Sequence, residues 1–274
     1  MAEAGTIKDV AQDASTSRPM GWAARVGLAA RGVVYLIMGW LAVLVALGAQ
    51  KHIDQRGALT EVLAQPLGSV LVALMALGFA AYALWRLSEA AFGVTGEPNT
   101  AGARLKSLAR GVAYGFLAYT AVSLLQGARG TQAGKQGRLA ADVMDQPYGR
   151  WAVGLAGAVL VVVGLMMVRE GWSDRFMRYF GSLPPGLRSP VIWLGRIGTV
   201  SRGVVFAVTG WLVILAAVRA DPDRAGGMDE AFHTLLDQPY GQALVVALGL
   251  GLIVFGVYGL AEAAWRRVSE EGES

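Results

Sequence analysis

Arginine and glutamate recur at fixed places in this chain, beside long apolar runs. Three strings, "ARVGLAARGVVY", "ARLKSLARGVAY" and "GRIGTVSRGVVF", align so that an arginine precedes a glycine in each, and a glutamate ends the second apolar run after each string. Charged side chains beside apolar segments pair with one another or mark a path for ions and solutes. The residues with the most chemical potential are therefore Arg31, Arg110, Arg202, Glu89, Glu170 and Glu262.

These six residues lie at the margins of the apolar runs and are expected to form a charge ring at one mouth of a helix bundle. The pairs that we expect, within a repeat or between neighbours, are Arg31–Glu89, Arg110–Glu170 and Arg202–Glu262. A functional interpretation is a gate or an anion-selecting ring. The structural alternative is that the arginines extend to the interface and pair with carboxylates to fix the hairpin geometry. Their marginal depth favours the structural alternative.

An aromatic residue follows each of these arginines by four positions, as Tyr35, Tyr114 and Phe206. Residues four apart share one face of a helix, so each arginine could stack on the ring one turn deeper. Packing or a place in the aromatic belt of the membrane interface is the commoner role of such rings.

Residues for enzymatic chemistry are scarce. The chain has no cysteine, and its two histidines, His52 and His233, occupy different positions in their repeats and show no clustered acid–histidine set in the sequence. No glycine-rich phosphate loop follows a strand. We therefore expect no catalytic, cofactor-binding or metal-binding residues and no enzymatic activity. Nucleic-acid binding is not expected either, because the arginines are spread along the chain and do not gather into one basic face.

The elements that must position the charges are membrane spans. Hydrophobic residues make up 54% of the chain and charged residues 16%, and the mean hydropathy is +0.46. Soluble domains carry about 25% charged residues. An apolar helix of about 20 residues crosses a bilayer. Six stretches fit this length: 32–49, 67–85, 111–128, 151–168, 203–218 and 241–261.

A pentapeptide marks the second span of each pair. "DQPYG" occurs at 145–149 and 237–241, with "AQPLG" at 64–68. Proline suits the first turn of a helix, so we expect helix starts at these elements. Apolar residues three and four apart just upstream predict short amphipathic helices on the membrane surface. The repeat-marking residues are Gln65, Pro66, Gly68, Gln146, Pro147, Gly149, Gln238, Pro239 and Gly241.

The predicted fold is an all-α integral membrane protein of six transmembrane helices, arranged as three parallel two-helix repeats around a pseudo-threefold axis. Each repeat holds two spans, so all three enter the membrane from the same side. That side carries 16 of the 24 lysines and arginines. The positive-inside rule therefore places both termini in the cytoplasm of a bacterial cell membrane.

The chain divides into six segments by composition. The predicted ranges are 1–20, a polar cytoplasmic tail; 21–93, 100–175 and 192–268, the three repeats; 176–191, an interfacial insertion; and 269–274, a second polar tail. The string "WSDRFMRYFGSLPPG" at 172–186 alternates aromatic and basic residues. This pattern predicts a cytoplasmic interfacial element that touches anionic lipid, with a plain surface loop as the alternative.

The strings "ARVGLAARGVVYLIMGWLAV" and "GALTEVLAQPLGSVLVALMALGFAAYALWRLSEA" resemble the bacterial membrane family catalogued as domain-of-unknown-function family number 1206. The resemblance covers about residues 25–266. It implies three two-helix units and a bacterial membrane location, and it supplies no activity or substrate. Leu67 stands where that family usually has an aromatic residue, and the middle copy ends in "LMMVREGW".

We expect a non-enzymatic, multi-pass inner-membrane protein that acts as a scaffold or accessory partner in the bacterial envelope. Its expected partners are the lipid bilayer, with anionic lipid at the cytoplasmic face, and a membrane protein or a second copy of the chain. The alternative is a small channel or facilitator with a path along the pseudo-threefold axis. A dry, packed axis would favour the first function and a wet axis the second.

Overall fold

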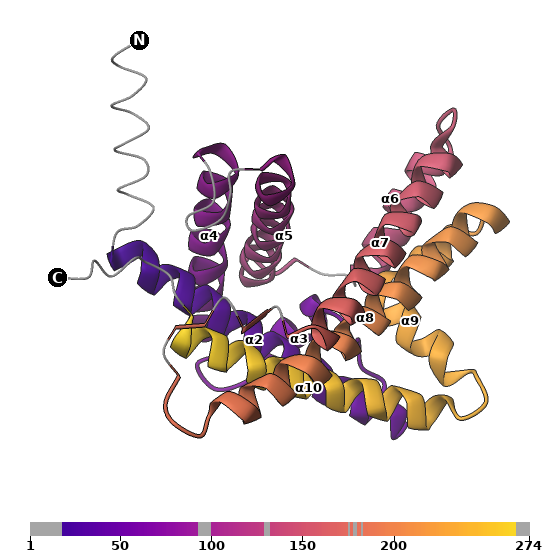
Figure 1. Cartoon of the computed structure of the whole chain (residues 1–274). Coiled ribbons are helices and arrows are strands. Elements are labelled where there is room, and N and C mark those ends of the chain that lie inside the picture. The colour runs from indigo at the N-terminus through magenta and orange to yellow at the C-terminus, as the bar shows by residue number, and fades with distance from the viewer. Residues whose placement is uncertain are drawn as a thin grey trace, which may run out of the picture.

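Six long helices dominate the protein, as predicted. The computed structural model describes residues 18–92, 100–128, 132–174, 176–177, 180–181 and 183–266, and the predicted polar tails lie largely outside this range. Each long helix is long and apolar enough to cross a membrane. They are α2 (Arg18–Ala46), α4 (Gly68–Phe92), α5 (Ala101–Leu125), α7 (Gly149–Trp172), α8 (Arg188–Arg219) and α10 (Gly241–Trp265) (Figure 1).

At one end of the bundle, most of these helices continue past the apolar runs. This is the end at which α2 begins and α10 ends. We call this the terminal end of each helix, and the opposite end the lid end. Arginines at the terminal ends can lay their aliphatic stems on apolar surface while their charged heads reach water. The helix can therefore continue past the apolar run, which is why the sequence placed these boundaries too far inside.

Short helices join the long helices at the lid end and confirm the predicted amphipathic segments. They are α3 (Gln55–Leu63), α6 (Gln132–Met144) and α9 (Gly227–Leu236), with a 3₁₀ turn, η2, at Pro222–Ala225. Their apolar faces pack on the bundle: Leu59 of α3 and Phe232 of α9 are completely or almost completely buried. We call α3, α6, α9 and their connections the lid.

The Gln-Pro-x-Gly element is a tight turn between a lid helix and the next long helix. In each copy the glycine N–H donates to the glutamine carbonyl, at 2.8 to 2.9 Å. The residue after proline has a positive φ: 61° at Leu67, 64° at Tyr148 and 62° at Tyr240. This is the geometry of a type II turn, in which proline suits the second position. The long helix therefore begins at the glycine, and the prediction that proline lies in its first turn is wrong.

The glycine of this turn has no room for a side chain. A Cβ at Gly68, Gly149 or Gly241 would overlap a carbonyl oxygen of the preceding lid helix, namely that of Val62, Val143 or Leu235. The three copies of one pentapeptide are thus explained by three copies of one turn.

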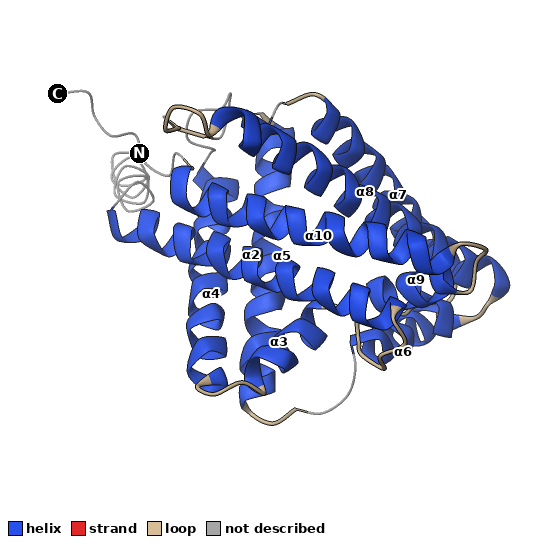
Figure 2. Ribbon diagram, turned by 90° about the horizontal axis from the view of Figure 1, so that it is seen from below, coloured by secondary structure: helices blue, strands red, loops and turns tan. Residues whose placement is uncertain are grey.

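The repeats are joined cyclically. The most extensive helix packing is between successive repeats, in the pairs α4–α5 and α7–α8, and between the third and first repeats in the pair α10–α2. Within a repeat, α2 packs on α4 and α8 on α10. Figures 1 and 2 show α2 and α10 side by side, with the α4–α5 pair crossing them steeply. The α7–α8 pair joins them through the packing of α8 on α10.

Glycines seven positions apart bring two of the three inter-repeat pairs, α2–α10 and α7–α8, close together. Gly32 and Gly39 of α2 face Gly256 and Gly249 of α10. The pair α7–α8 repeats this arrangement, because a Cβ at Gly164 would lie 2.6 Å from the Gly203 carbonyl oxygen. Helices in membranes associate through such small-residue faces, which bring the backbones together.

The second repeat is different, since α5 and α7 do not pack along each other. In the first repeat, a Cβ at Gly27 would lie 2.6 Å from the Gly78 carbonyl oxygen, and the third repeat has Gly198 and Gly251 at the equivalent places. The second repeat has Lys106 there on α5 and Val159 on α7. Two side chains replace two glycines, so the second hairpin cannot close as the others do.

Candidate functional site

Glu262 is the centre of the charged residues at the terminal ends. It is buried and accepts hydrogen bonds from Arg31 of α2 and from Arg266 just beyond α10. It therefore links the third repeat to the first. The pair of Glu262 with Arg202, which the alignment predicts, is not formed. The cyclic packing of α10 on α2 is the reason, because it brings the glutamate of one repeat beside the arginine of the next.

Glu89 is also buried, but it pairs within its own helix. Arg86 donates to Glu89 at 2.7 Å, and the hydroxyl of Ser107 on α5 donates to the same carboxylate at 3.0 Å. Arg86 also donates to the Tyr82 hydroxyl, at 2.8 and 3.0 Å. The expected pair of Glu89 with Arg31 is therefore not formed.

Arg202 is surrounded by aromatic rings and not by carboxylates. Its guanidinium carbon lies 5.2 Å from the ring centre of Tyr35 and 5.1 Å from those of Phe206 and Phe255. The Phe206 contact is the arginine–aromatic stacking that the spacing of four allows. Arg31 instead lies over Phe255, at 5.5 Å, and not over Tyr35. The Nε atom of Arg202 is buried and has no hydrogen-bond partner among the described residues, and the same holds for Nε of Arg31.

Together these side chains form what we call the terminal cluster: Arg31, Arg86, Arg110, Arg202, Arg266, Glu89, Glu170 and Glu262. Glu262 lies within electrostatic range of Arg31, Arg266 and Arg110, and Tyr114 lies within range of Arg31 and Arg202. The cluster holds five arginines and three glutamates. In the described part of the chain, the side chains of Arg110 and Glu170 have no ion pair or hydrogen bond. The expected Arg110–Glu170 pair is therefore also not formed.

A second set of arginines, each six residues before Arg31, Arg110 or Arg202, binds the ends of neighbouring helices. Arg25 donates to main-chain carbonyls at the end of α10, including that of Ala263 at 3.2 Å. Arg104 does the same at the end of α4, with its Nε 2.7 Å from the Ala90 oxygen. Arg196 instead forms two hydrogen bonds of 2.6 and 2.7 Å with Asp174, just past α7. Cations stabilise helix C-termini, so these arginines reinforce the inter-repeat pairs.

The lid brings both histidines of the chain to one carboxylate, a contact that no sequence pattern indicates. His52 Nδ1 lies 2.9 Å from Asp229, and His233 Nε2 lies 3.8 Å from it. Asp229 is buried and also accepts from the main-chain N–H of Ile53 at 2.7 Å. His52 is far from Asp229 in the sequence, so its partner could not be recognised there. No group of three acidic or histidine side chains in the described residues is arranged to hold a metal.

The first loop is also tied to the second loop. Arg56 of α3 donates to the Ala128 carbonyl at 2.6 Å, and Gln132 donates to Gln55 at 3.1 Å. Asp54 caps α3 by accepting from the Gly57 N–H at 2.6 Å. Burial raises the pKa of the Asp54 carboxyl above its ordinary value of 3.8. The three loops therefore interlock into one cover over the lid end.

Polar groups in the middle of the spans are satisfied locally. The hydroxyls of Thr120 and Thr209 donate to the carbonyls of Phe116 and Val205, each at 2.9 Å. Nearer the lid end of α5, Ser123 donates to the Thr120 carbonyl at 2.8 Å and accepts from Arg56 at 3.4 Å. Hydroxyls bonded back to their own helices offer little to a passing solute. In the middle of α2, α4 and α10 the interior is packed with apolar side chains, including Met38, Phe79 and Leu252, which are fully buried.

Two aromatic rings of the predicted interfacial insertion point inward. Phe176 and Phe180 are buried, with ring centres 5.5 and 5.8 Å from that of Tyr258 on α10. The main-chain N–H of Gly181 donates to the Trp265 carbonyl at 2.9 Å. These two rings therefore fasten the α7–α8 connection to α10 and do not lie against lipid. The range predicted for the insertion, 176–191, overlaps the start of α8, which begins at Arg188.

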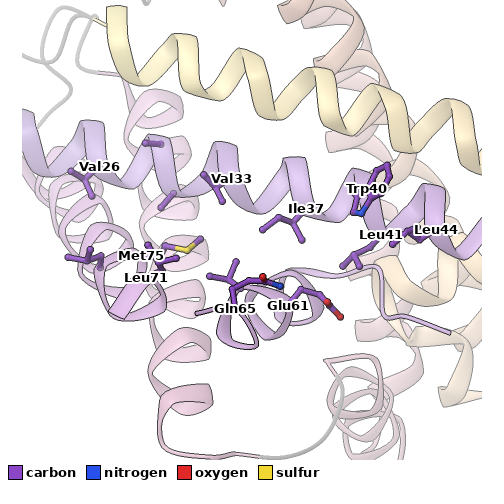
Figure 3. A pocket seen from close by; sticks show the side chains of 14 residues that line it. Val26, Val33, Ile37, Trp40, Leu41, Leu44, Glu61, Gln65, Leu71 and Met75 are labelled. Carbon is purple, nitrogen blue, oxygen red and sulfur yellow. The ribbon is translucent and has the colours of Figure 1, made fainter. Parts of the chain in front are cut away.

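An apolar groove runs along α2 between α3 and α4. Its volume is about 540 Å³, and its walls include Val33, Ile37 and Met75 (Figure 3). Glu61 and Gln65 lie at its lid end, and Glu61 is already paired with Lys51 at 2.6 Å. The groove could hold an apolar chain, but it presents no free charge that would select a headgroup.

By helix length, apolar composition and threefold repetition, the fold is that of a multi-pass helical membrane protein. The chain belongs to the family described as Domain of Unknown Function (DUF1206), whose profile matches residues 26–93, 105–174 and 197–266. It is 29% identical over 252 residues to an uncharacterized protein, YxxB, of Bacillus subtilis (strain 168), covering 90% of this chain and 91% of that protein. No solved structure matches the chain significantly.

Proposed function

We propose that the protein is a non-enzymatic accessory or scaffold protein of the bacterial cytoplasmic membrane, with its terminal ends in the cytoplasm. The observation that carries this proposal is the packed middle of the bundle, where apolar side chains are fully buried and the hydroxyls bond to their own helices. The interlocked lid adds a cover over one end. A bundle of this kind supports partners and does not need to conduct a solute.

A small channel or facilitator remains the second candidate, favoured by the open hairpin of the second repeat. The two candidates differ in whether water reaches the middle of the spans. The chain has no cysteine, so single cysteines can be placed at the equivalent positions Met38, Leu117 and Thr209. Each is then exposed to a membrane-impermeant thiol reagent from either side.

We expect all three cysteines to be protected from this reagent. Cysteines in the exposed lid residues Lys135 and Thr60 serve as positive controls for labelling from the lid side. Labelling of the mid-span positions would overturn the packed bundle and make the facilitator the better proposal.

A further inference from the structure

We propose that the seam between α5 and α7 binds an anionic phospholipid, with its acyl chains between the two helices and its phosphate near Lys106 and Arg110. We call this surface the second-repeat seam. The inference goes beyond the proposed function, since either a scaffold or a facilitator could hold such a lipid.

The apolar part of the seam is identified by comparison with the closed hairpins. Val163 of α7 is 38% exposed, whereas its equivalents Tyr82 and Phe255 are 1% and 4% exposed. Ala113 of α5 is exposed, whereas its equivalents Val34 and Val205 are buried. The faces that close the first and third hairpins are therefore uncovered in the second. In a membrane such a face is covered by lipid or by another helix.

The polar part of the seam is a surplus of cations. Lys106 and Arg110 lie one turn apart on α5, and neither has an ion pair or hydrogen bond among the described residues. Glu170 is the carboxylate at the end of α7, and one carboxylate does not balance these two cations.

The depth of these cations matches that of a lipid phosphate. Arg110 precedes the lid end of α5, at Leu125, by 15 residues, which is about 22 Å at 1.5 Å per residue. The hydrocarbon core is about 30 Å thick, so the backbone of Arg110 lies about 8 Å inside its terminal-side edge, a distance over which the long side chain can extend toward the headgroup layer. The seam then presents cations at the headgroup level and apolar side chains deeper, in the order in which a phospholipid presents its phosphate and acyl chains.

Charge complementarity favours a lipid over a second copy of the chain. A second copy docked through the same seam would bring its own Lys106 and Arg110 to this region and only Glu170 to neutralise them. Like charges in an interface oppose association. A soluble phosphate would satisfy the cations but leave the apolar faces of α5 and α7 uncovered. An anionic phospholipid satisfies both parts.

The test is lipid titration of the purified, delipidated full chain by native mass spectrometry. Phosphatidylglycerol and phosphatidylcholine with identical acyl chains are compared. We expect phosphatidylglycerol to bind more tightly than phosphatidylcholine. In the double variant Lys106→Gln with Arg110→Gln, the affinity for phosphatidylglycerol should fall about fivefold for each charge removed. The matched control is Lys135→Gln with Arg138→Gln on α6, two exposed cations of the lid, and it should leave the affinity unchanged.

A second variant, Val163→Trp, fills the apolar part of the seam and keeps every charge. It should weaken binding of phosphatidylglycerol at least several-fold while the thermal unfolding temperature stays within a few degrees of the wild-type value. Equal binding of both lipids, an unchanged affinity in the Lys106/Arg110 variant, or an unchanged affinity in Val163→Trp would each overturn the proposal. Competition by glycerol phosphate as strong as by the lipid would instead assign the cations to a soluble anion. Dimers that form in place of lipid binding would assign the seam to a second copy.

Discussion

Glu262 is the residue through which the third repeat holds the first. Its carboxylate is buried between Arg31 and Arg266, and removing one partner of a buried pair typically costs about 3 to 5 kcal/mol. Glu262→Arg should therefore lower the thermal unfolding temperature strongly. Adding Arg31→Glu should restore part of the loss, because the pair is re-formed with its charges exchanged. Adding Arg202→Glu is the control and should restore nothing, since Arg202 contacts aromatic rings. Equal recovery in both double variants would contradict the assigned pairing.

In the turn before α7, substitutions at two adjacent residues are expected to change the unfolding temperature in different directions. Tyr148 is exposed and has φ 64°, a conformation that costs a residue with a side chain about 1 to 2 kcal/mol. Tyr148→Gly should therefore preserve or raise the unfolding temperature. Gly149→Ala should lower it sharply, because its Cβ would overlap the Val143 carbonyl oxygen. Thermal unfolding in detergent separates the two, and tolerance of Gly149→Ala would show that the turn can rearrange.

Asp54 gives a prediction about pH. Burial raises its pKa in the folded protein, so the folded state binds a proton more readily than the unfolded state. Its contribution to stability is therefore full below its ordinary value of 3.8 and is lost as the pH rises through the raised value. Asparagine caps helices about as well as aspartate. Asp54→Asn should thus match the wild-type unfolding temperature at low pH and exceed it at neutral pH. A difference that does not change with pH would mean that the carboxyl is not perturbed by burial.

At the scale of helices, the close inter-repeat pairs depend on glycines that face another backbone. A Cβ at Gly210 would lie 2.6 Å from the Gly157 carbonyl oxygen, so Gly210→Ala should cost about 1 to 3 kcal/mol and disturb the α7–α8 pair. Gly115 of α5 has open space around it, so Gly115→Ala should be neutral or slightly stabilising. Unfolding temperatures of the two variants give the comparison, and equal effects would argue against close backbone contact between α7 and α8.

The same scale shows what the sequence could predict. The six spans, the lid helices and the three repeats follow from apolar periodicity and from the recurring Gln-Pro-x-Gly element. The sequence does not predict which helices pack together, because glycines on two faces of one helix look alike until the neighbouring helices are known. In the alignment, Lys106 of the second repeat stands where the first and third repeats have Gly27 and Gly198. This difference is a usable signal that the second hairpin differs.

Six members of the terminal cluster were predicted from the sequence, but Arg86, Arg266 and the pairing of the charges were not. Arg31 and Glu262 were both identified, yet cyclic packing is needed to bring them together across the length of the chain. The contact of His52 and His233 with Asp229 depends on two distant loops meeting in the lid, for which no local pattern exists.

On the scale of the whole molecule, two closed hairpins and one open hairpin are joined in a cyclic order. The lid ties the loops together, and the terminal cluster ties the third repeat to the first. The second repeat departs from this pattern at the two positions where it lacks glycine. Its open seam is the feature on which the lipid proposal rests, and its width can be measured directly.

The decisive measurement is the distance between spin labels at equivalent positions of the three hairpins in lipid nanodiscs. Cysteine pairs at Val33 and Ala81, Val112 and Val162, and Val204 and Val254 report the first, second and third repeats in the cysteine-free chain. We predict similar short distances in the first and third repeats and a longer one in the second. Three equal distances would contradict the open second hairpin.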